Sequence, residues 1–206
     1  MTSNRLDFIK IKDGRSETLG ANQYWFPQKF AALSGCGPTT AAEILAQLTK
    51  QYPIAMQGLP PESFGVLERK SFVRFMQEVR EYVKPGVMGL TDIDFYTDQT
   101  INYARSCGVN LKGIQIDSNI DAKAAYQTVI ETIDAGRPLA LLILTNPNPD
   151  IREFTWHWMT IIGYDKRKGS IIIATHGHMH TLDFSHVWVN GAGHKAGIVH
   201  FLPEGV

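Results

Sequence analysis

The segment from Ser34 to Thr40 constrains the fold of this chain most strongly, because it marks the start of a helix. Its residues, Ser-Gly-Cys-Gly-Pro-Thr-Thr, lead directly into an apolar run that begins at Ala41. Pro38 suits the first helical turn, where its missing N–H costs no hydrogen bond, and the flanking glycines allow a close backbone approach. Cys36, one of two cysteines, is thus expected at the positive end of a helix, which favours the nucleophilic thiolate.

Three further helices are expected in the first two-thirds of the chain. Apolar residues recur at helical spacing from 70 to 83, and Lys-Pro-Gly follows them. A second helix is expected to start near Thr91 and to end near Cys107. A third is expected between Asp121, a suitable N-cap residue, and Gly136, a suitable residue just past the end.

The last third of the chain reads as strands. Short β-branched or aromatic runs lie at 139–144, 156–164, 170–175 and 197–202, and turn-rich segments separate them. We therefore expect an α+β fold with a largely antiparallel sheet. The chain, residues 1–206, is expected to form a single domain, with a helical lobe over about 20–136 packed on a sheet lobe over about 137–206.

Composition excludes several classes of function. The chain has 20 basic and 20 acidic residues and a formal net charge of zero, so we expect neither a nucleic acid nor a membrane surface as its partner. It shows no signal-peptide-like apolar run and too few cysteines for a disulfide scaffold, which predicts a cytoplasmic protein. It also lacks a glycine-rich phosphate loop or dinucleotide fingerprint, so no cofactor is expected. The oligomeric state leaves no trace in the sequence.

His157 is the histidine best placed to serve Cys36. It opens the apolar run Trp158 to Tyr164, which reads as a buried strand whose alternation separates His157 and Met159 from Trp158. A histidine at a strand start can face a thiol at a helix start across two lobes. An imidazole in that place takes the thiol proton and later protonates the leaving group.

These segments resemble the papain-like cysteine peptidases, and among them the bacteriocin leader-processing, double-glycine type. The resemblance rests on Cys36-Gly37-Pro38-Thr39, on Ala135-Gly136-Arg137-Pro138-Leu139 and on the strand from His157 to Asp165, and it spans roughly Gln23 to Trp188. It implies that Cys36 is the nucleophile and that His157 is the general base. It also implies a peptide or amide substrate, bound in a cleft between a helical lobe and a sheet lobe.

Two positions depart from the family pattern. The family carries an oxyanion-hole glutamine shortly before the cysteine, at a position that Phe30 occupies here, so Gln28 is the first candidate and Gln23 the second. The family also carries an Asp or Asn at the end of the strand after the histidine, where this chain has Ala174-Thr175-His176-Gly177. Thr175, His176, a backbone carbonyl or Asp183 could orient the imidazole instead, and position favours His176 among them.

Alternative interpretations remain for several residues. Cys107, at the end of an apolar helix, is interpreted as a core residue. His176, His178 and His180 alternate as on one strand face and could hold zinc, but no carboxylate or thiol motif completes the set, so no metal is expected. The leading function is a cysteine peptidase or amidase. An acyl or peptidyl transferase with the same thioester, and an inactive binding module with the same fold, are the alternatives.

Overall fold

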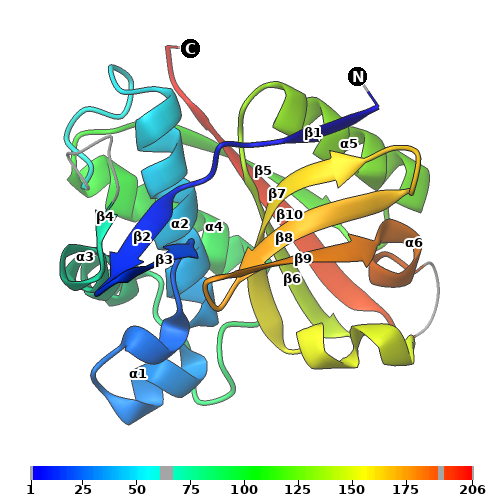
Figure 1. Cartoon of the computed structure of the whole chain (residues 1–206), viewed down its shortest axis with the longest axis horizontal. Coiled ribbons are helices and arrows are strands. Elements are labelled where there is room, and N and C mark those ends of the chain that lie inside the picture. Colours follow the sequence, from blue (N-terminus) through cyan, green and yellow to red (C-terminus); the bar gives the residue numbers. More distant parts are fainter. Residues whose placement is uncertain (1, 61–66, 190–192, 206) are drawn as a thin grey trace.

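The computed structural model describes residues 2–60, 67–189 and 193–205, which form helices around a large antiparallel sheet (Figure 1). The expected α+β class is confirmed. The order of strands in the large sheet is β5-β10-β6-β7-β8-β9, and β1 also pairs with β7. Their bounds are β1 Ser3–Arg5, β5 Leu111–Asp117, β6 Leu139–Thr145, β7 His157–Asp165, β8 Ser170–Thr175, β9 His178–Asp183 and β10 Lys195–Pro203.

Helices cover both faces of this sheet. One face packs against α2 and α4, with α3 against these two helices, through a core that includes Trp158 and Ile162 of β7. The other face packs against α5 and α6 through a core that includes Met159 and Ile161. The helix bounds are α1 Lys29–Ser34, α2 Cys36–Gln51, α3 Arg69–Tyr82, α4 Ile93–Ser106, α5 Ala122–Asp134 and α6 Phe184–Val187, with short 3-10 helices η1 Gln23–Trp25 and η2 Pro149–Phe154.

Local sequence signals placed most of these elements where they were expected. The side chain of Asp92 accepts a hydrogen bond from Phe95 N at the start of α4, and that of Asp121 accepts one from Lys123 N at the start of α5. Gly136, with φ of 80°, follows the C-cap of α5. The four expected strands correspond to β6, β7, β8 and β10.

The large sheet also draws strands from the first part of the chain. β5, which lies between α4 and α5, pairs along its whole length with β10. β1 pairs with the last residues of β7, beyond Ile161, where the pairing of β7 with β6 stops. Neither segment carries a run of apolar alternation as clear as those of the last third. The region before residue 137 therefore contributes strands as well as helices to the layers of the fold.

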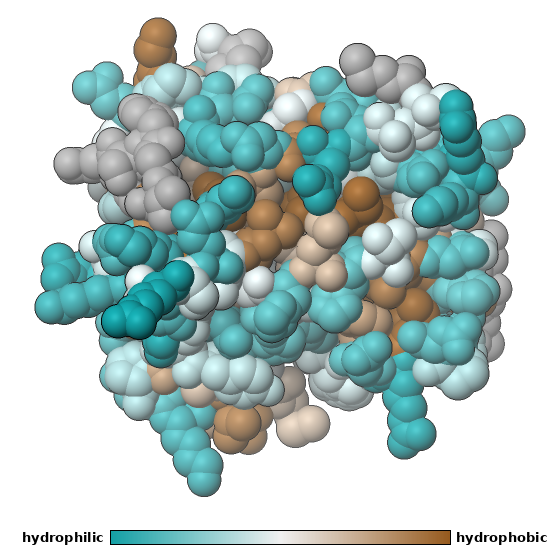
Figure 2. Space-filling view, viewed as in Figure 1, coloured by the Kyte–Doolittle hydropathy of each residue, from teal (hydrophilic) through white to brown (hydrophobic). Residues whose placement is uncertain are grey.

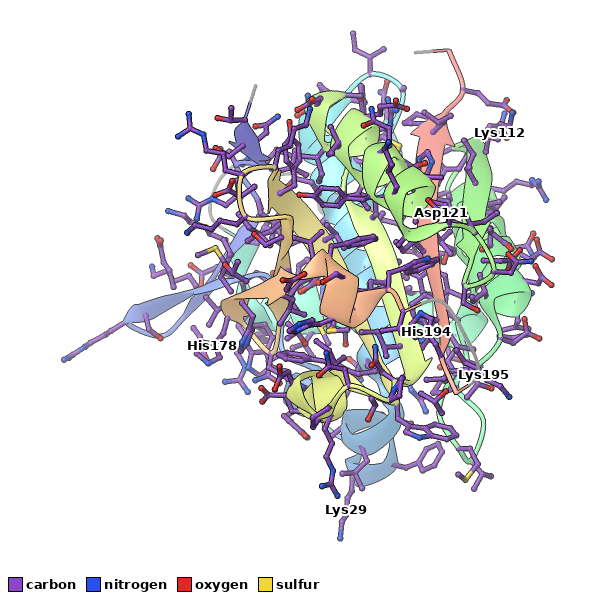
Figure 3. The ribbon with its side chains drawn as sticks, turned by 90° about the vertical axis from the view of Figure 1, so that its right-hand side faces the viewer. Lys29, Lys112, Asp121, His178, His194 and Lys195 are labelled. Atoms are coloured by element: carbon purple, nitrogen blue, oxygen red, sulfur yellow. The ribbon has the colours of Figure 1, made fainter. Side chains whose placement is uncertain are left out.

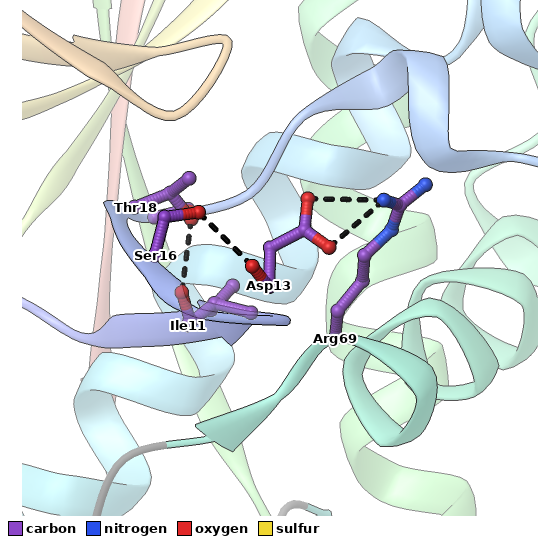
Figure 4. A network of polar contacts seen from close by, with 6 residues as sticks. Ile11, Asp13, Ser16, Thr18 and Arg69 are labelled. Atoms are coloured by element: carbon purple, nitrogen blue, oxygen red, sulfur yellow. Dashed lines mark hydrogen bonds and ion pairs between the residues drawn. The ribbon is translucent and has the colours of Figure 1, made fainter.

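A small second sheet fixes the segment that leads toward Cys36. β2 (Lys10–Asp13) and β3 (Ser16–Leu19) form a hairpin, and β4 (Leu67–Glu68) runs parallel to β2. Both carboxylate oxygens of Asp13 lie 3.0 Å from Arg69 Nη1, which ties the hairpin to the start of α3 (Figure 4). Leu19 N donates to Gly177 O at 3.1 Å, so the hairpin also contacts the turn between β8 and β9.

Hydrophilic groups predominate on the face drawn in Figure 2. Hydrophobic groups there lie in the depressions between them and also project at the upper left and at the lower edge. None of the helices in the described part of the chain is long and apolar enough to cross a lipid bilayer.

Candidate active site

Cys36 is the first residue of α2, and two glycines make room for the chain around it. A Cβ atom on Gly35 would lie 2.4 Å from Ala31 O, and one on Gly37 would lie 2.7 Å from Leu90 Cδ2. Both distances are shorter than any van der Waals contact, so only glycine lets α1 and Leu90 pack this closely at the helix start. The sequence motif thus serves packing as well as helix initiation.

The Cys36 thiol is buried, with 8% of the residue exposed. Burial raises the pKa of this thiol, although the backbone N–H groups of Trp158, Gly37 and Cys36 itself act in the opposite direction. The expectation of a resting thiolate at the helix end is therefore wrong for this closed site, because desolvation outweighs the helix end.

His157 is the first residue of β7, and its ring makes one hydrogen bond and one stacking contact. Its Nε2 atom lies 2.7 Å from Thr175 Oγ1, at the end of the adjacent strand β8. Its ring stacks on that of His176, with centroids 4.8 Å apart and planes inclined by 12°. The ring of His176 stacks in turn on Tyr24 at 5.3 Å. The imidazole therefore has little freedom to rotate.

Burial, with a smaller contribution from His176, lowers the pKa of His157 to about 3. The resting site consequently pairs a neutral imidazole with a neutral thiol. Burial also lowers the pKa of His176, with further contributions from His178 and His180.

Backbone strain concentrates beside this histidine. Among the described residues, Trp156 and His176 are the non-glycine residues with positive φ, at 54° and 51°. Trp156 directly precedes His157, and His176 directly follows Thr175. Strained backbone of this kind costs about 1–3 kcal/mol and is found preferentially at functional sites.

Cys36 and His157 line one small polar cavity of about 10 Å³. Three buried polar atoms of its lining have no hydrogen-bond partner among the described residues: Gln23 Oε1, Thr39 Oγ1 and His176 Nδ1. A cavity of this size with several polar partners matches the requirements of a single water molecule. The full lining is Ala21, Gln23, Cys36, Thr39, Thr40, Glu43, His157, Trp158, Ala174, Thr175 and His176.

The two glutamines lie in different places. Gln23, in η1, is buried and lines the cavity with Cys36, and its Nε2 atom donates to Ala32 O at 2.8 Å. The same Nε2 atom also donates to Leu33 O at 3.5 Å, a long and weak hydrogen bond. Gln28 is the exposed N-cap residue of α1 and does not line this cavity. The structure therefore brings Gln23, not Gln28, to Cys36, because η1 folds back against α1.

A larger groove opens on the other side of Cys36. It measures about 380 Å³, and most of its lining is apolar. Exposed side chains rim it, with Val87 89% and Trp156 55% exposed. Its lining comprises Phe30, Leu33, Ser34, Cys36, Val87, Met88, Gly89, Leu90, Thr91, Leu144 and Trp156. Cys36 thus lies between a small polar cavity and an open apolar groove.

Residues 18–182 match the sequence model of the Peptidase_C39 like family. The chain belongs to this family. Its expected resemblance to papain-like cysteine peptidases is thereby confirmed. Curated proteins gave no match. Among solved structures, UfSP from C. elegans aligns with 99% of this chain at 9% sequence identity and a TM-score of 0.45. The chain spans 34% of that protein's length.

Against the pattern expected of this C39-like family, the stretch from Ala174 to Gly177 stands where an Asp or Asn was expected to orient the histidine, and His176 was the favoured substitute. Asp183, the more distant alternative, accepts a hydrogen bond from Ser185 N at 2.8 Å and caps α6. It does not line the cavity that holds His157. Of the side chains considered for the orienting role, Thr175 bonds the ring edge and His176 covers the ring face.

The other histidines of this C39-like chain lie in different environments. His178 is exposed on β9, His180 packs edge-on against Phe154, and His178 and His194 are well separated in Figure 3. Within residues 2–60, 67–189 and 193–205, no group of three His, Cys, Asp or Glu side chains is arranged to hold a metal ion. Cys107 is the half-buried C-cap residue of α4.

Glu43 is the site residue that the sequence interpretation missed. It is fully buried and lines the Cys36 cavity, where its Oε1 atom accepts a hydrogen bond from Ala21 N at 2.7 Å. Its Oε2 atom lies 2.5 Å from Thr160 Oγ1 on β7. The only signal in the sequence is a carboxyl group inside the otherwise apolar run Ala41 to Leu45.

The lowered pKa of His157 can be tested by NMR titration. The C2 proton resonance of His157, assigned with His157→Gln, is expected to stay constant between pH 8 and 5 in the folded protein. In urea the same proton should titrate near its ordinary value of 6.5. A native midpoint near 6.5 would contradict the buried neutral imidazole.

Proposed function

We propose that this chain hydrolyses peptide or amide bonds through an acyl-thioester on Cys36, with His157 as general base. The observation that carries the proposal is the shared cavity of Cys36 and His157, in which Thr175 engages one ring nitrogen of the histidine. The family supports a thiol peptidase, and two free cysteines agree with the reducing, cytoplasmic location that we infer.

The neutral resting pair favours general-base catalysis over a preformed ion pair. The sulfur attacks the substrate carbonyl carbon while His157 takes the thiol proton, so that a C–S bond forms and an imidazolium appears. Its Nε2–H then donates to Thr175 Oγ1. The imidazolium gives its proton to the leaving amine as the C–N bond breaks, and His157 afterwards deprotonates the water that hydrolyses the thioester.

Two groups are the candidates to stabilise the oxyanion. The Cys36 backbone N–H lies at the start of α2, and the Gln23 side chain lines the same cavity, where its amide N–H groups, which donate to Ala32 O and more weakly to Leu33 O, would turn toward the substrate oxygen. Such donors act on the charge that develops in the transition state. We infer that Gln23 fills the role for which the spacing had suggested Gln28.

The apolar groove beside Cys36 supports a peptide substrate with a hydrophobic side chain near the bond that is cleaved. Phe30, Leu33, Met88 and Trp156 present large apolar surfaces there and offer no charged group to a substrate. A peptide segment with leucine or phenylalanine near the scissile bond is therefore the first substrate to test.

The first prediction concerns the nucleophile. Cys36→Ala should lower hydrolysis of such peptides at least about a thousandfold, because no thioester can form. It should also abolish labelling by a peptidyl acyloxymethyl ketone, detected by intact mass. Cys107→Ala is the control and should leave both unchanged. A wild-type protein that neither cleaves peptides nor accepts the label would instead support the inactive binding module.

Hydrolysis and transfer share the thioester and differ only in the acceptor. Products formed by the wild-type protein with and without an added amine, measured by mass spectrometry, decide between them. Release of the free acid as the main product with the amine present supports the peptidase. A dominant amide product would favour the transferase.

The second prediction concerns the oxyanion hole. Gln23→Ala should lower kcat about a hundredfold with little change in KM, since the donated hydrogen bond forms mainly in the transition state. Gln28→Ala, at the exposed start of α1, is the control and should retain full activity. A lowered kcat in Gln28→Ala together with full activity in Gln23→Ala would assign the oxyanion hole to Gln28 instead.

The third prediction concerns Thr175. Thr175→Val keeps the shape of the side chain but removes the hydroxyl, and it should lower kcat about fivefold, in line with one lost hydrogen bond of roughly 1 kcal/mol. Thr175→Ser restores the hydroxyl and should recover most of the activity. Equal kcat values in the two variants would show that Thr175 does not orient His157.

A further inference from the structure

Glu43 connects the three segments that carry the site. It lies on α2, two turns after Cys36 and on the same side of the helix. Ala21, which donates its backbone N–H to Oε1, shortly precedes Gln23, and Thr160, which bonds Oε2, shortly follows His157. One carboxyl group therefore links the helix of the nucleophile, the segment of the oxyanion donor and the strand of the general base.

The fit around this carboxyl group is tight. A Cβ atom on Gly20 would lie 2.5 Å from Glu43 Oε1, so the backbone before Ala21 passes directly against the carboxyl group. Because Gly20 has φ of 75°, a side chain there would also be strained. A carboxyl group held between backbone and strand has no room to turn toward His157, and it makes no hydrogen bond to that ring. Its action on the reaction is therefore indirect.

The surroundings of Glu43 contain no compensating positive charge. The titratable groups that face it are Cys36 on its own helix, Tyr96 on α4, His157 on β7 and His176 after β8. Among the described residues, no lysine or arginine forms an ion pair with it. Burial raises the pKa of Glu43 to about 8, although the hydrogen bonds from Thr160 and Ala21 favour the charged form. At neutral pH the carboxyl group is thus protonated.

We propose that Glu43 is a positioning residue that holds the Gln23 segment and the His157 strand against the Cys36 helix as a neutral carboxyl group, and that its ionisation weakens the nucleophile. This proposal rests on the proposed function. A negative charge behind Cys36 disfavours the transient thiolate, since like charges in a buried site raise the pKa of an acid. In the bond to Thr160 the hydroxyl donates to Glu43 Oε2, so ionisation changes the charge of the acceptor and not its partner.

Glu43→Gln tests the charge. The amide keeps an acceptor for Ala21 N and cannot ionise, and its N–H faces the Thr160 hydroxyl, which then accepts the hydrogen bond that it donates in the wild type. At pH 7 its kcat/KM should lie within about threefold of the wild-type value. At pH 9.5 alkylation of Cys36 by iodoacetamide should be about tenfold faster in Glu43→Gln than in the wild type, which corresponds to a thiol pKa lower by about one unit. Superimposable pH profiles would overturn the proposal.

Glu43→Leu tests the hydrogen bonds, with a matched control. It should lower kcat about tenfold or more while KM stays within about twofold, because misplaced groups affect the transition state most. Gln47→Leu replaces the next buried polar residue of α2, outside the site, and should change only the melting temperature. A Glu43→Leu variant with an altered melting temperature but wild-type kcat would reduce Glu43 to a structural residue.

Alkylation needs no substrate, so it separates the two proposals. A pH profile that differs between wild type and Glu43→Gln, in a protein that cleaves no peptide, would overturn the proposed function and support the electrostatic role of Glu43. If the wild-type and Glu43→Gln proteins both cleave peptides and their alkylation profiles are identical, the proposed function is supported and the electrostatic role of Glu43 is overturned. If Glu43→Leu does not fold, the Glu43→Gln profile alone decides.

Discussion

The packing of α2 against β7 is the interaction on which the rest of the site depends. It places the start of a helix beside the start of a strand, so that the sulfur of Cys36 and the ring of His157 meet at the same cavity. Trp158 of β7 ties the same strand to α4 and to the segment before it, because its indole nitrogen donates to Leu90 O at 2.7 Å and its ring stacks on Tyr96 at 4.0 Å. The residue after His157 thus helps to fix the strand against the helical layer.

The same packing sets the electrostatics of the site. Burial raises the pKa of Cys36 and lowers that of His157, and both shifts favour the uncharged forms. Glu43 follows the same rule, with a raised pKa. A site built from three neutral titratable groups avoids the cost of buried charge at rest. In the reaction that we propose, charge develops only as the thioester forms, beside the start of α2, Gln23 and Thr175.

These pKa shifts also make stability depend on pH. For His157 the folded value lies below the unfolded one, so its contribution is complete above pH 6.5 and is lost as the pH falls toward 3. For Glu43 the folded value lies above the unfolded one, so its contribution is complete below pH 4.5 and is lost as the pH rises toward 8. Burial of His157 therefore leaves the fold most stable at high pH, whereas burial of Glu43 leaves it most stable at low pH.

The sequence by itself determined the α+β class, the helix that starts at Cys36, the strand that starts at His157 and the relation to the family. Glycine and proline punctuation, caps and apolar periodicity are local signals, and they act within a few residues. Only the tertiary structure decided that Gln23 rather than Gln28 shares the cavity of Cys36, that Thr175 bonds His157, that β5 joins the sheet and that Glu43 is held between Ala21 and Thr160. Each of these depends on contacts between segments far apart in the chain. The charge state of Cys36 was decided in the same way, because desolvation is a property of the packed interior that a local helix-start motif does not contain.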